Sequence, residues 1–222
     1  MGDRPSRDAL YDGLASVAKA LGSGRRAELV DVLAQGERRV DDLAVEIGQS
    51  VANTSHHLQI LLRVGLVRTR REGTRVYYAL ASEQVTQLWM VMRDVASAHA
   101  ANVARLADAY LGDRSDLDVF SRDQLLDRLR AGDVVVLDVR PHIEFAAGHV
   151  AGAINIPAED LAQHLRQLPD GTQVVAYCRG PLCVLSVDAV RLLRNAGRPA
   201  ALLEDGYPEW AMAGLPVERA DA

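Results

Sequence analysis

Residues 51–80 read VANTSHHLQILLRVGLVRTRREGTRVYYAL, and the spacing of their apolar residues changes within this run from helical to strand-like. Leucines recur at three- and four-residue intervals in the first half, which predicts an amphipathic helix over 51–64. Residues 66–80 then alternate, turn at Glu72-Gly73 and alternate again. The run therefore predicts a helix followed by a two-stranded hairpin.

The surroundings of this run indicate a reader of DNA. A short helix predicted at 41–47 ends at Gly48, so that two helices are joined by a tight turn ahead of the hairpin. The second helix begins with side chains that can bond to base edges in a major groove, namely Asn53, Thr54, Ser55, His56, His57 and Gln59. Pattern alone leaves open an ordinary helical hairpin with a polar surface.

Charge supports the DNA-binding interpretation locally. Residues 1–111 carry 14 Arg and Lys against 13 Asp and Glu, whereas residues 112–222 carry 11 against 17. Within 53–80, five arginines face a single acid, Glu72. This excess predicts phosphate contacts from the hairpin, with Arg68, Arg70, Arg71 and Arg75 as the candidates. A solvated, arginine-rich hairpin would have the same composition.

The helix and hairpin resemble the recognition helix and wing of ArsR-type winged-helix repressors. Residues 55–58 (SHHL) and 65–67 (GLV) carry the resemblance, which covers about 6–110. It implies double-stranded operator DNA as a partner. It also implies a homodimer built from helices at 6–21 and 83–110, and the long apolar stripe of the second helix supports the same interface.

The same family often senses metal ions, through cysteines near the helix at 41–47 or through His and Asp pairs on the long helix. Residues 38–47 contain no cysteine, and the long helix offers only Asp94, His99 and Asp108. We therefore expect no metal site and no cofactor.

The second half of the chain has an α/β pattern. Short apolar runs alternate with helical periodicity, as expected for a mostly parallel sheet covered by helices. The strands are predicted at 134–138, 173–177 and 200–203, and the helices at 122–130, 158–167 and 184–196.

A cysteine lies at the end of one of these strands. The strand at 173–177 runs into Cys178-Arg179-Gly180-Pro181-Leu182-Cys183, and a helix follows from Val184. Backbone N–H groups and the helix dipole lower the pKa of a thiol in such a position, and the thiolate is the reactive form. A positive charge at Arg179 suits an anionic sulfur substrate. A buried structural cysteine is the alternative.

The second half resembles a single rhodanese domain over about 117–219. The motifs are residues 136–140 (VLDVR) with 144–157 (EFAAGHVAGAINIP), the cysteine loop, and 203–210 (LEDGYPEW) with 214–217 (GLPV). The resemblance implies Cys178 as the nucleophile that carries a persulfide, in a six-residue loop of the length associated with sulfur substrates. The substrate-binding residues would be Arg179, Gly180, Pro181, Leu182 and Val184. Asp138, Arg140, Glu144 and His149 would be scaffold residues.

The loop departs from the commoner family pattern. Gly180 is third, Pro181 is fourth, and Cys183 takes a position often held by Ser or Thr. Cys183 could attack a persulfide on Cys178, release sulfide and leave a disulfide, so it is a candidate resolving thiol. Sequence does not establish the geometry that a bridge requires, and a cysteine with no redox role stays open.

Composition sets the remaining limits. Of the 222 residues, 49% are hydrophobic and 25% are charged, which excludes a disordered chain. The longest apolar runs are too short to span a bilayer, and no signal peptide is visible, so we expect a cytoplasmic protein with no membrane partner. We expect a mainly α winged helix-turn-helix domain at 1–111, a linker at 112–118 and an α/β rhodanese-like domain at 119–222, with a mostly parallel central sheet.

Together these features predict a transcriptional regulator, most simply a repressor, that senses reactive sulfur by persulfidation of Cys178. Its small-molecule partner would be a sulfur-containing anion or a persulfide. The alternative is a sulfurtransferase that passes sulfane sulfur from thiosulfate or a persulfide to a thiol or cyanide and controls its own gene. A third interpretation makes the second domain an unreactive docking module.

Overall fold

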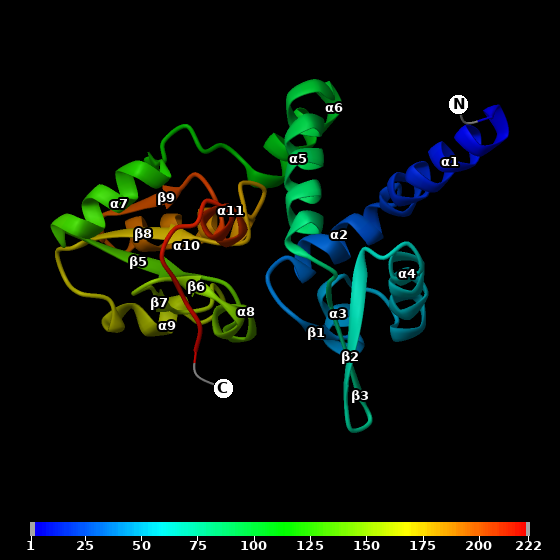
Figure 1. The fold of residues 1–222 in the computed structure, drawn as a ribbon. Coiled ribbons are helices and arrows are strands. Elements are labelled where there is room, and N and C mark those ends of the chain that lie inside the picture. The colour runs from blue at the N-terminus through cyan, green and yellow to red at the C-terminus, as the bar shows by residue number, and fades with distance from the viewer. Residues whose placement is uncertain (1–2, 221–222) are drawn as a thin grey trace. The chain divides into compact units, whose positions relative to one another are not determined.

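The computed structural model describes residues 3–220 of the chain. Its internal contacts divide it into two compact units, Met1–Arg93 and Asp94–Ala222. The first unit is mainly helical and the second has a parallel sheet at its centre (Figure 1), which confirms the predicted fold classes. The division falls within helix α5 (Glu83–His99), whereas the sequence places a linker at 112–118, and that linker stays a prediction.

The first unit combines short helices with a three-stranded antiparallel sheet of order β1-β3-β2. Its elements are α1 (Arg4–Leu21), α2 (Gly24–Leu33), β1 (Arg38–Arg39), α3 (Val40–Glu46), α4 (Val51–Arg63), β2 (Val67–Glu72), β3 (Arg75–Leu80) and the first part of α5.

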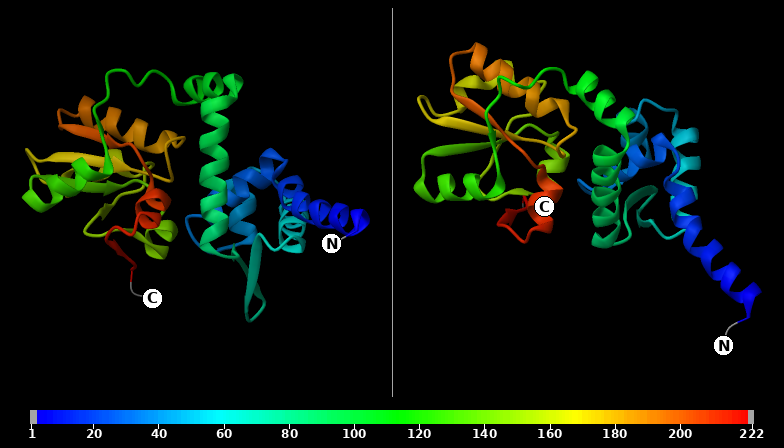
Figure 2. Two further views of the ribbon diagram at one scale, coloured as in Figure 1. Left: turned by 45° about the horizontal axis from the view of Figure 1, so that its top comes forward. Right: turned by 90° about the horizontal axis from the view of Figure 1, so that it is seen from above.

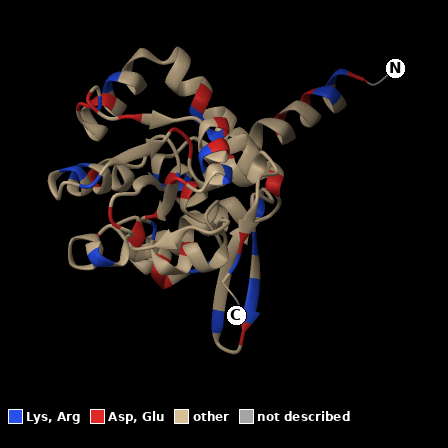
Figure 3. Cartoon of the chain, turned by 90° about the vertical axis from the view of Figure 1, so that its left-hand side faces the viewer, with Lys and Arg blue, Asp and Glu red and all other residues tan. Residues whose placement is uncertain are grey.

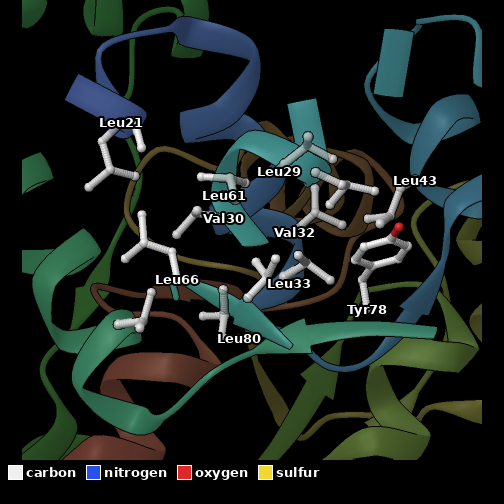
Figure 4. Packing of buried hydrophobic residues seen from close by; sticks show 14 of the residues in the cluster. Leu21, Leu29, Val30, Val32, Leu33, Leu43, Leu61, Leu66, Tyr78 and Leu80 are labelled. Atoms are coloured by element: carbon white, nitrogen blue, oxygen red, sulfur yellow. The ribbon is translucent and has the colours of Figure 1, made fainter. Parts of the chain in front are cut away.

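Helix α4 is fixed at both ends and along one face. The Ser50 side chain accepts a hydrogen bond from the backbone N–H of Asn53 at 3.2 Å, and Gly65, with φ +75°, ends the helix. Leu58 and Leu61 are fully buried in a cluster with side chains of α2, α3 and β3 (Figure 4). The predicted leucine face of this helix is therefore its core face.

The hairpin that follows α4 projects from the unit. Strands β2 and β3 pair from Val67 opposite Leu80 to Glu72 opposite Arg75. Val67 is buried at its base, and the remaining residues of β2 are exposed. The predicted hairpin thus forms a wing anchored at its open end.

The prediction of one continuous helix over 83–110 is wrong. The structure has α5 and then α6 (Ala101–Leu111), separated at Ala100, whose φ of −99° and ψ of +96° are extended. This part of the sequence has no Gly or Pro that would announce a break. The side chain of Trp89 ties α5 to α2, because its Nε1–H donates to Asp31 Oδ1 at 2.7 Å.

The second unit is built on a five-stranded sheet of order β4-β9-β8-β5-β7, in which each neighbouring pair is parallel. A separate antiparallel pair joins β6 and β10. The elements are α6, β4 (Val119–Phe120), α7 (Arg122–Ala131), β5 (Val134–Asp138), α8 (His142–Ala147), β6 (His149–Val150), β7 (Ile154–Asn155), α9 (Leu161–His164), the 3-10 helix η1 (Leu165–Gln167), β8 (Gln173–Tyr177), α10 (Val184–Asn195), β9 (Ala200–Leu203), α11 (Tyr207–Met212) and β10 (Val217–Glu218).

Helices cover both faces of this sheet, as Figure 2 shows. Alternate strand residues enter two apolar clusters. Val174 and Ala176 join Val187 of α10 on one face, whereas Val175 and Tyr177 join Trp210 of α11 on the other. The three central strands have the bounds predicted from sequence. The helix predicted at 158–167 is shorter and ends in the 3-10 turn. Leu161 at its start and Leu168 just after the turn are both buried in the core.

Among residues 3–220, no helix combines the length and the apolar character that crossing a membrane requires.

We expect Leu61→Ala to lower the free energy of unfolding by about 2–5 kcal/mol, because the truncation leaves a cavity in a fully buried site. Urea titration followed by circular dichroism measures the loss. Val45→Ala, at a position that is 84% exposed, is the control and should cost less than about 0.5 kcal/mol. Equal losses in the two variants would contradict the packing described for α4.

Candidate functional site

The first candidate surface is the exposed side of α4. Asn53, His56 and Gln59 are exposed there, and Ser55 is half-buried. Thr54 differs, because it is fully buried and its hydroxyl donates to the Ser50 carbonyl at 3.0 Å. Its side chain therefore belongs to the start of the helix rather than to the surface that the sequence predicted.

His57 lies at the edge of this surface and faces α2. It is half-buried, and its Nδ1 has no hydrogen-bond partner among the described residues. Burial, followed by the positive charge of Arg26, lowers the pKa of His57 below its ordinary value of 6.5. The imidazole is therefore neutral at pH 7.

The wing carries the second group of predicted residues. All four arginines, Arg68, Arg70, Arg71 and Arg75, are exposed, and Figure 3 shows basic residues on both of its strands. Arg70 is held within the protein, because its guanidinium bonds to Glu37 at 2.6 Å and to Glu72 at 3.0 Å and stacks over Tyr77. It is thus less available to phosphate than its exposure suggests.

The second candidate site lies at the carboxyl edge of the parallel sheet. Asp138, the last residue of β5, pairs in register with Tyr177, the last residue of β8. The chain following each parallel strand emerges at this edge. Cys178, the residue after Tyr177, is therefore placed beside the segment that follows β5.

The two cysteines are joined in a disulfide. Their Cα atoms are 6.2 Å apart, within the usual range for disulfides. Cys178 is 1% exposed within the core, whereas Cys183 is half-buried and directly precedes α10. The geometry that the sequence left open is thus available to this pair.

The segment after β9 supports the loop from the side. The backbone N–H of Tyr207 donates to the Cys178 carbonyl at 3.0 Å. A Cβ at Gly206 would lie 2.2 Å from the backbone nitrogen of Gly180, so only glycine allows this approach. Gly206 and Tyr207 both belong to the motif at 203–210, but nothing in the sequence indicates that they contact the cysteine loop.

Arg179 has a different environment from the one expected. Its Nε donates to Glu144 Oε1 at 3.0 Å, and its Nη2 donates to the same oxygen at 2.6 Å. The Glu144 side chain, on α8, is fully buried and that of Arg179 is 16% exposed. The positive charge beside the cysteine is thus already paired.

A second buried ion pair lies at the carboxyl edge of the parallel sheet. Arg140 Nη2 is 2.6 Å from Asp138 Oδ2, and both side chains are fully buried. The Tyr177 hydroxyl donates to the same carboxylate and accepts from the Val150 N–H at 3.1 Å. Burial raises the pKa of Tyr177 far above its ordinary value, so it stays a neutral donor. The expected scaffold role of Asp138 and Arg140 agrees with these contacts.

Among residues 3–220, no group of three or more His, Cys, Asp and Glu side chains is arranged to hold a metal ion.

Comparisons with known proteins assign both halves. Residues 23–69 match the family model for bacterial regulatory proteins of the arsR family, and residues 121–213 match the rhodanese-like domain. The HTH-type transcriptional regulator Rv0324 of Mycobacterium tuberculosis is 48% identical over 217 residues, which cover 98% of this chain and 95% of that protein.

Solved structures match each half separately. The homodimeric winged helix-turn-helix DNA-binding domain of Mb0332 from Mycobacterium bovis is 44% identical, with a TM-score of 0.42, and the match covers 45% of this chain and 92% of that one. A rhodanese-related protein from Thermoplasma volcanium is 27% identical, with a TM-score of 0.42, over 46% of this chain and 97% of that one.

The near-full-length relative and the two family models confirm the resemblances predicted for the two halves. The chain belongs to the ArsR family of HTH-type transcriptional regulators and carries a rhodanese-like domain after its winged helix-turn-helix domain.

Proposed function

We propose that this regulator is a repressor that senses reactive sulfur species through Cys178 and Cys183. The observation that carries the proposal is the pairing of these two cysteines within one loop of the rhodanese-like domain. In a regulator, a reaction at such a pair can serve as a signal rather than as one step of a turnover.

The first step is sulfur transfer to Cys178. Its thiolate attacks the outer sulfur of a persulfide, R–S–SH, so that Cys178–S–SH forms and R–S⁻ leaves. Support comes from its place at a strand end, ahead of the N-terminus of the twelve-residue helix α10. Backbone N–H groups and the helix dipole at such a position stabilise a thiolate.

The second step closes the disulfide. The Cys183 thiolate attacks the inner sulfur of Cys178–S–SH, the S–S bond of the persulfide breaks, and HS⁻ leaves. The sulfane sulfur is thereby reduced to sulfide, and the two cysteines are oxidised. The 6.2 Å separation of their Cα atoms supports this step.

The DNA-binding part of the proposal rests on α4 and the wing. We expect Asn53, Ser55, His56 and Gln59 to face the major groove, with His57 at the edge of this surface, and Arg68, Arg71 and Arg75 to contact phosphates. Thr54 is left out because it is buried, and Arg70 contributes less because it is paired with Glu37.

Exposed apolar side chains support a homodimer. Leu10, Tyr11 and Leu14 of α1 are each about 60% exposed, and Leu88 and Val91 of α5 are 40% and 54% exposed. Clusters of this kind mark protein interfaces. A dimer formed through α1 and α5 would read symmetric half-sites of double-stranded operator DNA in the cytoplasm.

We expect Arg75→Ala to weaken binding to DNA and to reduce the slope of log affinity against log salt by about 1, because one phosphate contact is lost. Fluorescence anisotropy on a fragment of the promoter of the chain's own gene, at several salt concentrations, measures both. Arg130→Ala removes another exposed arginine, from α7 of the rhodanese-like domain, and should leave the slope unchanged. An unchanged slope in Arg75→Ala would place the wing off the DNA.

We expect polysulfide treatment to weaken promoter binding by about 5–150-fold at fixed salt, the usual range of allosteric coupling. Cys178→Ser should not respond. Cys183→Ser should gain a persulfide and, if the disulfide is the signal, keep its DNA affinity. Equal binding in every state would refute sensing, and continued turnover of thiosulfate and cyanide by wild type but not by Cys178→Ser would favour a sulfurtransferase.

A further inference from the structure

The cysteine loop has one charged side chain, and a buried carboxylate neutralises its charge. Five of its six residues, Cys178, Gly180, Pro181, Leu182 and Cys183, carry no charged group. The sixth, Arg179, donates through two nitrogens to the fully buried carboxylate of Glu144. Such a two-nitrogen pair is geometrically well defined, and its net charge is zero. The loop therefore offers an incoming anion no uncompensated guanidinium of its own.

The segment that supports the loop adds no uncompensated positive charge. Gly206 contacts the backbone of Arg179 and Gly180, and it directly follows Glu204 and Asp205. Asp205 pairs with Arg122 at 2.6 Å, whereas Glu204 is exposed to solvent. This segment therefore supplies no counter-charge for a donor with two negative charges.

The outer surface of the loop is apolar rather than ionic. Leu182 is 36% exposed, Pro181 is half-buried, and neither can compensate a charge. These side chains suit a donor with an organic substituent. The arrangement thus favours donors of low charge on two separate grounds.

We infer that the loop takes sulfur from organic sulfane-sulfur compounds with at most one negative charge at the sulfur-bearing group, such as persulfides and thiosulfonates, and discriminates against the thiosulfate dianion. This inference rests on the proposed function, because it names the donor class for Cys178. It also reverses the expectation that Arg179 favours an anionic substrate.

Two small donors test the charge directly. Methanethiosulfonate carries one charge and reacts as Cys178–S⁻ + CH₃–SO₂–S⁻ → Cys178–S–S⁻ + CH₃–SO₂⁻. Thiosulfate carries two and reacts as Cys178–S⁻ + S–SO₃²⁻ → Cys178–S–S⁻ + SO₃²⁻. In both reactions the thiolate forms an S–S bond as the donor's S–S bond breaks, so the donors differ mainly in charge and in a methyl group.

The experiment uses full-length Cys183→Ser, in which the reaction stops at the persulfide. Intact-protein mass spectrometry follows the gain of one sulfur atom, and each rate is divided by the rate of the same donor with free cysteine. We expect the normalised rate with thiosulfate to be at least about tenfold lower than with methanethiosulfonate, a factor equivalent to about 1.4 kcal/mol. Cys178→Ser with Cys183→Ser is the blank.

The outcomes separate the two proposals. Equal normalised rates would overturn the donor preference while leaving sulfur loading of Cys178 in place. No loading by either donor would overturn the proposed function itself, and the donor preference with it.

A charge added to the loop provides a second measurement. In the Cys183→Ser background, Leu182→Arg places a new guanidinium on an exposed position and should raise the thiosulfate rate about tenfold, with little effect on methanethiosulfonate. Leu182→Gln is the matched uncharged control. If neither donor responds to the new charge, charge does not set donor choice and the inference fails.

Glu144→Gln tests the ion pair in the same background. It releases the charge of Arg179 and should also raise the thiosulfate rate. Asp170→Asn removes one negative charge near the start of β8, at the opposite edge of the sheet, where Asp170 pairs with Arg198 at 2.8 Å. An equal rise in both variants would assign the effect to net charge and contradict a role for Glu144. Circular dichroism checks that each variant folds. If Glu144→Gln does not fold, the Leu182 variants alone test the effect of charge on donor choice.

Discussion

Charges buried in pairs hold the carboxyl edge of the rhodanese-like domain together. Asp138 and Arg140 pair at the end of β5, where both side chains are fully buried, and the buried Glu144 pairs with Arg179 of the cysteine loop. Removing one partner of such a pair leaves a charge without water or counter-ion, which typically costs about 3–5 kcal/mol. The chain after β5 and the cysteine loop after β8 are therefore held by ion pairs in which the loss of either partner destabilises the domain. The position of Cys178 depends on them.

The same pairing decides the chemistry that the loop can offer. An arginine beside a cysteine is usually interpreted as a binding group for anions, but here its nitrogens are engaged by a buried carboxylate. The other five residues of the loop are uncharged, and the two cysteines pack in or against the apolar core cluster. This environment is the basis of the proposed sulfur transfer from donors of low charge and of the proposed sensing role.

Much of the architecture could be predicted from local sequence. The central strands at 134–138, 173–177 and 200–203 have the predicted bounds, because short apolar runs flanked by polar turns suit a buried parallel sheet. The break at Ala100 could not be predicted, since no Gly or Pro marks it. Pro169 marks the end of the helix before it but not the change to a 3-10 turn at Leu165–Gln167. Both depend on how the chain packs rather than on the residues at the break.

The candidate sites also combine features that follow from local sequence with features that depend on tertiary packing. By itself, the sequence determined the two domain types, the helix at 51–64 with the hairpin after it, and the two cysteines, because spacing and residue type specify these locally. Only the tertiary structure decided that Thr54 is buried, that Glu37 holds Arg70 and that Glu144 neutralises Arg179. The two partners of each ion pair are more than 30 residues apart, so their distance is set by the packing of helices and strands and not by the local pattern.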